Sequence, residues 1–561
     1  MPRPAGLSAS FTAIITLYQL RKNWYDQWIS CWTAGLDNER IRHKQRCNRL
    51  SERVSEKLSG GIMSFAYDER IDGKLPDFDR DEVVTAIRAA VPGLSVLHSE
   101  EHLRPYECDG LSAYRTVPLC VVLPETIEQV CNVLKFAKAR GIPVVARGAG
   151  TGLSGGAMPL AKGILLVMAK FNRILDIDPV SCTARVEPGV RNLAISQAVA
   201  PHGLYYAPDP SSQIACSIGG NVAENAGGVH CLKYGLTVHN ILRVDIVTID
   251  GELVTLGSDA LDSPGFDLLA LFTGSEGMLG IVVEVTVKLL PKPQSAKVLL
   301  ASFDDVQKAG AAVADIIGAG IIPGGLEMMD NLAIRAAEDF IKAGYPVDAE
   351  AILLCELDGT QSDVDEDMQR VESILRNAGA VDIRIARDET ERLKFWAGRK
   401  NAFPAVGRIS PDYYCMDGTI PRRELPRVLT GIAKLSEEYG LRVANVFHAG
   451  DGNMHPLILF DANTPGELDR AEGIGGKILE LCVEVGGSIT GEHGVGREKI
   501  NQMCVQFTTE ELQLFHAVKA AFDPLGLLNP GKNIPSLHRC AEFGSMHVHH
   551  GQLPFPELER F

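Results

Sequence analysis

The chain has 561 residues, a formal net charge of −16, and a composition that is 45% hydrophobic and 22% charged. This length exceeds what one hydrophobic core usually organises, so we expect two large domains with appendages. The negative charge argues against DNA or RNA as a partner, because neutralisation of phosphates supplies most of that affinity. The 13 cysteines include no CxxC pair, which argues against a zinc ribbon or an iron–sulfur ligand set. No stretch approaches the roughly 20 apolar residues that span a bilayer, and we expect the cytoplasm.

Residues 1–62 differ in composition from the rest of the chain. They hold ten Lys and Arg against five Asp and Glu, and Trp24, Trp28 and Trp32 recur every four residues. On a helix these rings would share one face beside basic residues, a pattern typical of a membrane interface. Because sequence of ordinary domain character starts directly after Met63, we favour a different interpretation. Residues 1–62 are then an N-terminal extension from an upstream start site and not part of the native protein.

The next large segment begins with a strand, a helix and a second strand. Two apolar runs, VPLCVVLP and IPVVARG, flank a helical pattern over residues 126–140. The second run ends in the tract RGAGTGLSGG at residues 147–156. So many glycines let successive backbone N–H groups turn inward, where they can form a nest for a pyrophosphate.

The same tract also satisfies the dinucleotide fingerprint of a Rossmann fold through Gly150, Gly152 and Gly155. That fold requires a helix to open at the third glycine, with its N-terminus on the phosphates. Pro159 and Gly163 interrupt any such helix, and a strand-like run follows instead. We therefore expect strand after strand here and not a Rossmann fold.

Two more glycine-rich tracts follow at residues 217–228 and 274–280. Tight turns alone would explain any single tract, because glycine is the default residue of such turns. Three tracts in one strand-rich segment, mixed with Asn and Ser donors, favour a long ligand bound across several loops.

After about residue 293 the pattern changes to alternating strands and helices. The runs KVLLASF, GGLEMMD, AILLCEL and VDIRIA read as strands with helical stretches between them. Asp304 and Ser362 are the expected N-caps of two of these helices. This alternation is typical of an α+β layer of ferredoxin-like units, which we expect to close over one face of the ligand.

Two short segments in this half carry the candidate chemistry. His448 and His455 flank a Gly/Asp/Asn turn between apolar strands, so a hairpin would bring them to one side. Glu492 and His493 stand in a second glycine-rich strand exit. Two imidazoles and a carboxylate can bind zinc, manganese or ferrous iron with positions left open for substrate, although this spacing alone more often belongs to two unconnected histidines. Asp451 is an alternative ligand or, by the simpler reading, a residue that stabilises the turn.

The three glycine-rich tracts, in this order and spacing, resemble the FAD-binding domain of the vanillyl-alcohol oxidase and p-cresol methylhydroxylase type of flavoprotein. The resemblance implies an α+β fold with a two-part FAD-binding domain and a ferredoxin-like α+β substrate cap. The first tract would cradle the pyrophosphate, and the other two would line the ribityl chain and the isoalloxazine. Members with covalent flavin often place a histidine in the first loop, and this chain has none there, so non-covalent FAD is implied. The cofactor-binding residues are then expected to be Arg147, Gly148, Gly150, Thr151, Gly152, Ser154, Gly155, Asp209, Pro210, Ser217, Gly219, Gly220, Asn221, Asn225, Gly228, Tyr234, Gly235, Glu276, Gly280 and Ile281.

The segments HAGDGNMHP and GEHGVGREK resemble the D-lactate, D-2-hydroxyglutarate and glycolate dehydrogenase branch of this flavoprotein family. The resemblance implies that His448, His455 and Glu492 hold a divalent metal, zinc or manganese, and that His493 removes the hydroxyl proton. The segment FWAGRKN implies that Arg399 grips the substrate carboxylate.

Cys415 marks a departure within this branch. The 2-hydroxyglutarate members offer a lysine to the substrate where this chain has Cys415, which argues against that larger diacid.

The segments DERIDGKLPD near the start and FDPLGLLNPGKN near the end resemble most the large flavin subunits of bacterial glycolate oxidases. This resemblance implies oxidation of a small 2-hydroxy acid, glycolate or D-lactate, with a second flavin-domain subunit and an iron–sulfur subunit as partners. Contact with the cytoplasmic face of the inner membrane would be peripheral and made through those partners. Two alternatives stay open, a stand-alone D-lactate dehydrogenase and a non-catalytic FAD-binding scaffold. The expected division is an extension at 1–62, an arm at 63–114, an FAD-binding domain at 115–292, a cap with a returning C-terminal segment at 293–534, and a tail at 535–561.

Overall fold

The structure is a computed structural model that describes residues 75–260 and 265–535. The expectations for the extension over residues 1–62 and for the tail after residue 535 lie outside the described residues. Within the described ranges, no helix is long and apolar enough to cross a membrane.

The first part of the FAD-binding domain is a four-stranded sheet of order β1–β2–β4–β3. Strands β2, β4 and β3 run parallel and β1 is antiparallel to them. The helix expected over 126–140 is present as α6, where Thr126 caps the first turn by accepting the N–H of Gln129, and Gly141 ends it with φ 65°. The elements are α4 (Arg80–Ala90), β1 (Ser95–Leu97), α5 (Glu100–Leu103), β2 (Cys120–Leu123), α6 (Ile127–Arg140), β3 (Val144–Arg147) and β4 (Ile164–Val167).

The second part is a five-stranded antiparallel sheet of order β5–β6–β10–β8–β9. Between β3 and β4, residues 148–163 form turns and no helix, so strand follows strand as the proline and glycine there predict. The second glycine-rich tract opens a short helix, α8, instead of staying a loop. The elements are β5 (Ile174–Asp178), β6 (Thr183–Val186), α7 (Asn192–Val199), β7 (Leu204–Tyr205), α8 (Ile218–Glu224), α9 (Cys231–Tyr234), β8 (Ile241–Val247), β9 (Leu253–Gly257), α10 (Leu268–Phe272), β10 (Ile281–Lys288) and β11 (Leu290–Pro291).

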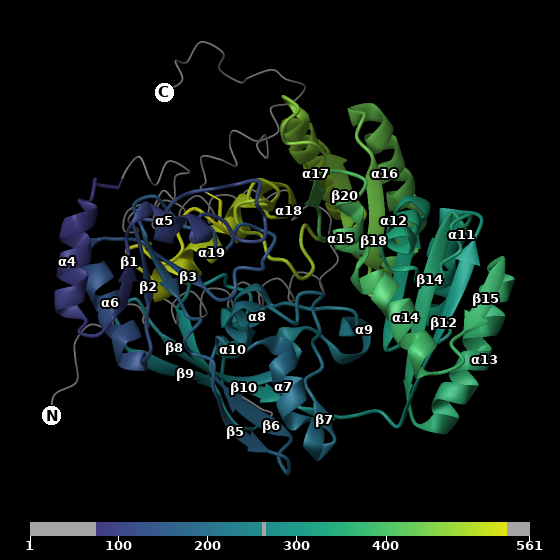
Figure 1. The fold of residues 1–561 in the computed structure, drawn as a ribbon, viewed down its shortest axis with the longest axis horizontal. Helices are drawn as coiled ribbons and strands as arrows, with labels where there is room; N and C mark the ends of the chain where they lie inside the picture. The colour runs from purple at the N-terminus through teal and green to yellow at the C-terminus, as the bar shows by residue number, and fades with distance from the viewer. Residues whose placement is uncertain (1–74, 261–264, 536–561) are drawn as a thin grey trace, which may run out of the picture. The chain divides into compact units, whose positions relative to one another are not determined.

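The cap is an antiparallel sheet with helices on both faces (Figure 1). Along β12, Leu299 and Ala301 pack with the core of α11, α13, α16 and α17, whereas Val298 and Leu300 pack with that of α12, α14 and α15. This alternation follows from the two-residue period of a strand. The elements are β12 (Ser295–Phe303), α11 (Val306–Gly318), β13 (Gly325–Asp330), α12 (Asn331–Ile341), β14 (Ala351–Gly359), α13 (Gln361–Asn377), β15 (Asp382–Ile385), α14 (Glu389–Lys400), α15 (Ala402–Val406), β16 (Asp412–Cys415), β17 (Gly418–Thr419), α16 (Leu425–Tyr439), β18 (Val443–His448), β19 (Asn453–Met454), β20 (Pro456–Phe460) and α17 (Glu467–Glu484).

Both predicted N-caps in the cap were wrong by one or two positions. Asp305, not Asp304, accepts the N–H of Gln307 at the start of α11. Thr360, not Ser362, accepts the N–H of Asp363 at the start of α13. In each case two capping residue types stand close together, and the backbone conformation decides between them.

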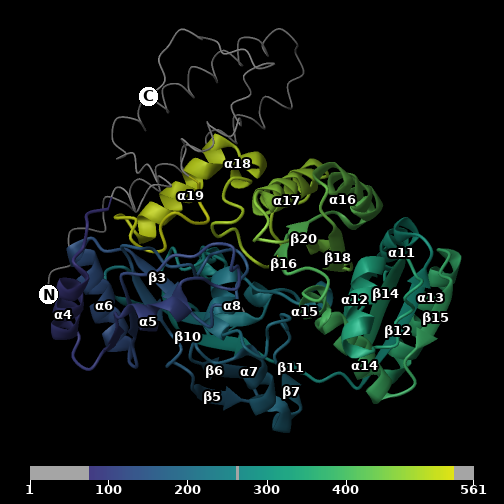
Figure 2. The ribbon, with the colours of Figure 1, turned by 45° about the horizontal axis from the view of Figure 1, so that its top comes forward.

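After α18 (Met503–Gln506) and α19 (Thr509–Phe522), the chain returns to the FAD-binding domain (Figure 2). Leu528 forms a parallel bridge with Val144 of β3. The Nζ atom of the buried Lys532 donates to the carbonyl oxygens of Gly156 (3.1 Å) and Met158. These contacts hold the C-terminal segment against the end of the first glycine-rich tract.

Candidate active site

A cavity of about 460 Å³ lies between the glycine-rich loops of the FAD-binding domain and the hairpin and helices of the cap. This volume falls within the usual range for ligand and cofactor sites, about 300–1,000 Å³. The predicted cofactor-binding residues that line it are Arg147, Gly148, Gly150, Thr151, Gly152, Pro210, Ser217, Gly219, Gly220, Asn221, Glu276, Gly280 and Ile281. The remaining seven, Ser154, Gly155, Asp209, Asn225, Gly228, Tyr234 and Gly235, lie outside its wall.

Several of these glycines leave backbone open to the cavity. A Cβ on Gly152 would have Glu224 Oε1 at 3.9 Å as its nearest neighbour, and one on Gly220 would have Ser217 Oγ at 3.4 Å. The protein itself has room for a methyl group at both positions. Both glycines line the cavity, so their missing side chains leave space for a ligand. Ser217 also joins the first two tracts, because its Oγ accepts the N–H of Ala149 at 3.2 Å. The loops thus form a cradle in which a ligand can approach the backbone closely, as a pyrophosphate requires.

Two of the seven residues outside the wall bond to other parts of the protein instead. The hydroxyl of Tyr234 donates to the Asp358 carboxylate of the cap. Asp209 forms an ion pair with His230, Oδ2 to Nδ1, at 3.0 Å. Both contacts are structural, so the predicted cofactor contact of these two side chains is not supported by their position.

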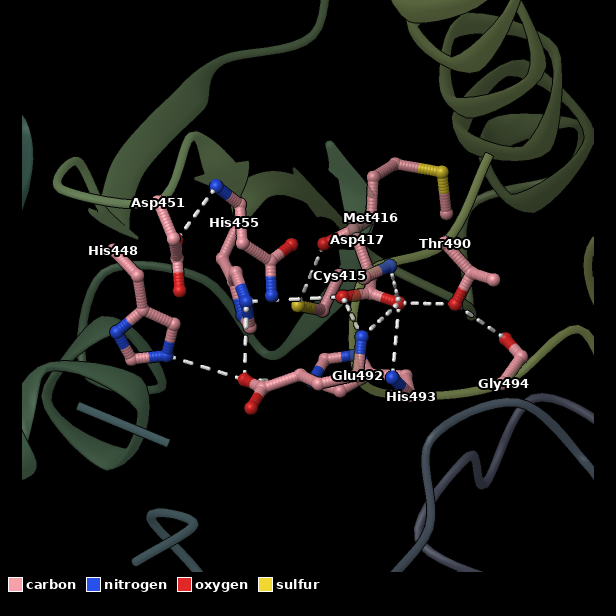
Figure 3. A network of polar contacts seen from close by, with 12 residues as sticks. Cys415, Met416, Asp417, His448, Asp451, His455, Thr490, Glu492, His493 and Gly494 are labelled. Carbon is pink, nitrogen blue, oxygen red and sulfur yellow. Dashed lines mark hydrogen bonds and ion pairs between the residues drawn. The ribbon is translucent and has the colours of Figure 1, made fainter. Parts of the chain in front are cut away.

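The hairpin formed by β18, β19 and β20 brings the two predicted histidines together (Figure 3). The ring centroids of His448 and His455 are 5.0 Å apart. Glu492 Oε1 lies 3.1 Å from Nε2 of His448 and 3.3 Å from Nε2 of His455. One ligand atom from each of the three residues lies within 4.8 Å of the others, which is close enough for all three to bind one ion.

The donor set fits a divalent metal. Among the residues that the structure describes, Nδ1 of the buried His455 has no hydrogen-bond partner, and its Nε2 has only ion-pair contacts, with Glu492 and Asp417; unpaired buried polar atoms are costly. Burial opposes a charge on His448, but the carboxylates of Glu327 and Glu492 outweigh it and raise the pKa of His448 well above its usual range. Burial would also raise the pKa of Glu492, but His448 and His455 lower it well below its usual value. The carboxylates of Glu327 and Glu492, which favour a positive charge on His448, would also favour a bound cation.

His493 adjoins this cluster. Its ring lies 4.7 Å from that of His455, centroid to centroid, and edge-on to it. Burial lowers the pKa of His493 to about 4, which the carboxylate of Asp417 offsets only in part. The imidazole is therefore uncharged near pH 7. Ligand atoms of Cys415, His455 and His493 also lie within 4.8 Å of one another, so His455 is common to two potential ligand sets.

Arg399 reaches the cavity from α14. Its side chain is 1% exposed, and its Nε donates to Glu327 Oε2 at 2.7 Å. In the described part of the chain, Nη2 of Arg399 has no hydrogen-bond partner. One edge of the guanidinium is thus fixed while a donor stays available at the cavity wall, which Arg399 shares with Lys400 and Phe403. Such an arrangement suits a carboxylate ligand.

Comparison with known proteins places the chain in a family. Residues 118–257 match the family described as "FAD binding domain", and residues 292–533 match "FAD linked oxidases, C-terminal domain". The chain belongs to the FAD-linked oxidase family. The resemblance noted from the glycine-rich tracts, and the α+β fold that it implied, are confirmed.

This FAD-linked oxidase has curated relatives that it matches over most of their length. The glycolate oxidase subunit GlcD of Escherichia coli strain K12 is 77% identical over 499 residues, which are 89% of this chain and 100% of that protein. The GlcD of Bacillus subtilis is 39% identical over 428 residues, 76% and 91% of the two chains. A D-lactate dehydrogenase of Anaerostipes hadrus is 32% identical over 447 residues, 78% and 94%. The solved structure of p-cresol methylhydroxylase with substrate bound has a TM-score of 0.71 at 19% identity, covering 83% of this chain and 99% of that one, and this likeness shows the fold alone.

Two buried residues of the oxidase site were missed by the sequence analysis. Asp417 accepts hydrogen bonds from the backbone N–H groups of Gly491, Glu492 and His493. Glu327 contacts both His448 and Arg399. For Glu327 the available signal was an acidic residue among apolar ones in GGLEMMD, because a buried carboxylate must have partners.

Cys415, by contrast, lies outside the cavity wall. Its thiol is buried and donates to the carbonyl oxygen of Met416 at 3.3 Å. Its contact with a substrate, on which the argument against a larger diacid depended, is not supported by this position.

Proposed function

We propose that this FAD-linked oxidase converts glycolate to glyoxylate, accepts D-lactate as a second substrate, and uses non-covalent FAD with a divalent metal, zinc or manganese. The main support is the position of three potential metal ligands, His448, His455 and Glu492, which lie within 4.8 Å of one another. They line the same cavity as the glycine-rich cradle. The relatives at 77% and 39% identity, both called glycolate oxidase subunits, support the choice of substrate.

Each resident group would supply one piece of chemistry. The cradle would hold FAD, which would supply the acceptor for a hydride from C2 of the substrate. His448, His455 and Glu492 would hold a divalent ion, which would supply a Lewis acid that lowers the pKa of the substrate hydroxyl. All other steps are performed by side chains of the chain itself.

His493 is the proposed general base. A hydride leaves C2 readily only when the adjacent hydroxyl loses its proton, and a neutral imidazole at the cavity wall can take that proton. Arg399 is proposed to grip the substrate carboxylate with the guanidinium edge that Glu327 does not occupy. His493 at the hydroxyl and Arg399 at the carboxylate would contact both ends of a two-carbon acid, so C2 would be held in one orientation.

Flavin reduction by candidate acids tests this proposal. The purified holoenzyme is mixed without oxygen with glycolate, D-lactate or D-2-hydroxyglutarate, and the loss of the oxidised flavin absorbance is followed. We expect rapid bleaching by glycolate and bleaching by D-lactate, and the diacid serves as the comparison. A flavin that is stable to all three acids would support the scaffold alternative and overturn the proposal.

Chelation tests the metal part separately. We expect exhaustive dialysis against a chelator to abolish bleaching while FAD stays bound, and Mn²⁺ or Zn²⁺ to restore it. Metal analysis of the dialysed protein serves as the control, because unchanged activity in metal-free protein would remove the ion from the proposal.

We also propose that the reduced flavin is reoxidised through a second flavin-domain subunit and an iron–sulfur subunit, at the cytoplasmic face of the membrane. The name "subunit" of the two glycolate oxidase relatives supports partners in general. Turnover of the isolated chain with an artificial dye but not with a quinone would agree with this proposal. Efficient quinone reduction by the chain alone would favour the stand-alone D-lactate dehydrogenase, to which the relative in Anaerostipes hadrus points.

A further inference from the structure

Glu327 stands between the proposed metal site and the proposed carboxylate site. It lies on β13 directly opposite His448 of β18 in the antiparallel register. Residues that face each other in this way point to the same side of a sheet. Arg399 comes from α14, 72 positions away along the chain, and reaches the same carboxylate.

Each oxygen of this carboxylate has its own partner. Oε1 lies 2.8 Å from Nδ1 of His448, and Oε2 accepts the Nε–H of Arg399 at 2.7 Å. The Glu327 side chain is 1% exposed, so water does not compete for either oxygen. Hydrogen bonds of this kind to an ionised group are about twice as strong as neutral ones.

The first contact selects the tautomer of His448. A carboxylate beside Nδ1 is an acceptor only, so the ring proton resides on Nδ1 and points at Glu327. With Nδ1–H donated to Glu327, Nε2 is the nitrogen left for a metal; it lies 3.1 Å from Glu492 Oε1, which accepts the Nε2–H when no ion is bound. This nitrogen is the atom that a metal shared with Glu492 would bind.

The second contact fixes the plane of the Arg399 guanidinium. Glu327 occupies Nε, which leaves Nη2 without a hydrogen-bond partner among the described residues. Because the guanidinium is flat and rigid, one charged contact at Nε orients the donors on its other nitrogens.

We propose that Glu327 is a positioning residue that couples the metal site to the site for the substrate carboxylate. The inference rests on the proposed function and deepens it. One carboxylate sets the ligand nitrogen of His448 and the donor edge of Arg399 at once, so a change at Glu327 weakens both sites together. Neither the metal nor the substrate needs to touch Glu327 for this effect.

Glu327→Gln is the decisive variant, because a glutamine amide has one acceptor and one donor end. It can accept from His448 or from Arg399, but its NH2 group then faces a second donor. We expect the metal dissociation constant, measured by competition with a chromogenic chelator, to rise about 10–100-fold, the usual effect of losing an outer partner of a histidine ligand. Acetate binding to metal-free protein, followed by the flavin difference spectrum, should weaken at least about fivefold.

Glu356→Gln is the matched control. Glu356 is also a buried carboxylate of the cap sheet, on β14, where it accepts from Arg392 (2.6 Å) and Trp396 (2.5 Å) and lies 3.3 Å from Nε2 of His230. Its loss should lower the melting temperature and leave both binding constants unchanged. If Glu327→Gln does not fold, Glu327→Asp keeps the charge but is too short to span both partners, and it should show the same paired loss.

The outcomes separate this inference from the function beneath it. If the wild-type protein binds metal and acetate and Glu327→Gln alters one constant only, or neither, Glu327 does not couple the sites. If Glu356→Gln weakens both constants as much, the effect is general destabilisation and the inference is overturned. A wild-type protein that binds neither metal nor acetate would overturn the proposed function itself.

Discussion

The carboxylate of Asp417 accepts a hydrogen bond from the backbone N–H of His493, Oδ2 to N, at 3.0 Å. The same carboxylate accepts the N–H group of Glu492 at 3.2 Å (Figure 3), and it accepts that of Gly491 at 3.1 Å. Lys499 supplies the opposite charge, with its Nζ 3.1 Å from Oδ2. Both side chains are fully buried, so this pair determines how the loop with the proposed ligand and base is presented to the cavity.

We predict that Asp417→Asn lowers the metal affinity and the rate of flavin reduction at least about tenfold. An amide has one acceptor in place of two, so it cannot hold three backbone N–H groups, and it leaves Lys499 with only the more distant carboxylate of Glu498, 3.6 Å from its Nζ. Breaking one side of a buried ion pair costs about 3–5 kcal/mol, which urea unfolding would measure. Asp451→Asn is the control. Its carboxylate accepts the N–H of Asn453 in the hairpin turn, and an amide oxygen can do the same, so metal binding should persist. A larger loss of metal in Asp451→Asn would favour Asp451 as a ligand.

The sequence predicted those parts of the site that lie within short segments. The histidine pair was recognisable because a turn of glycine and polar residues separates two apolar strands, and local chain geometry then brings the rings together. Glu327 was not recognisable, because it is 121 positions from His448 and meets it only through the register of β13 and β18. The cofactor tracts were predicted as loops, yet the second one forms α8, since tertiary packing of Ile218 and Val222 overrides the weak helix propensity of its glycines.

We predict that His493→Ala retains FAD but slows flavin reduction by at least about 10²-fold, within the usual contribution of a general base. The ring is at the cavity wall and edge-on to His455, so its removal leaves the proposed ligands in place. Anaerobic stopped-flow spectroscopy gives the rate, and the absorbance of the isolated protein gives the flavin content. A variant that reduces its flavin at the wild-type rate would remove the role of His493 as base.

We predict that Gly152→Ala weakens FAD binding at least about tenfold without lowering the stability of the apoprotein. The added methyl group has 3.9 Å to its nearest protein atom, so the protein accommodates it, whereas a cofactor lying against the backbone does not. Fluorescence titration of the apoprotein with FAD measures the affinity. Gly318→Ala is the control, because a Cβ there meets no heavy atom within 4 Å in the described ranges and the site is far along the chain in α11. Equal FAD affinity in the two variants would mean that the first tract does not approach the cofactor.

His230 joins the two domains through a pair of carboxylates, and this contact makes stability depend on pH. Its Nδ1 lies 3.0 Å from Asp209 Oδ2 of the FAD-binding domain, and its Nε2 lies 3.3 Å from Glu356 Oε1 of the cap. Arg392 is the other charged group at this contact, and it pairs with Glu356 at 2.6 Å. Burial opposes protonation of a ring that is only 23% exposed, but Asp209 and Glu356 outweigh it and raise the pKa of His230 to about 10.

A pKa above the unfolded value of about 6.5 means that the folded state holds the proton more tightly. The stabilisation by His230 is therefore fully present below about pH 6.5 and is lost as the pH rises through about 10. We predict that His230→Gln lowers the free energy of unfolding by at least about 1 kcal/mol at pH 6 and that this difference shrinks steadily by pH 9. Urea unfolding of both proteins across this range measures it, with the exposed His202→Gln as the control that should show no difference. A difference that stays constant or grows with pH would show that His230 is neutral between its two carboxylates, and that the contact between the domains depends on packing instead of charge.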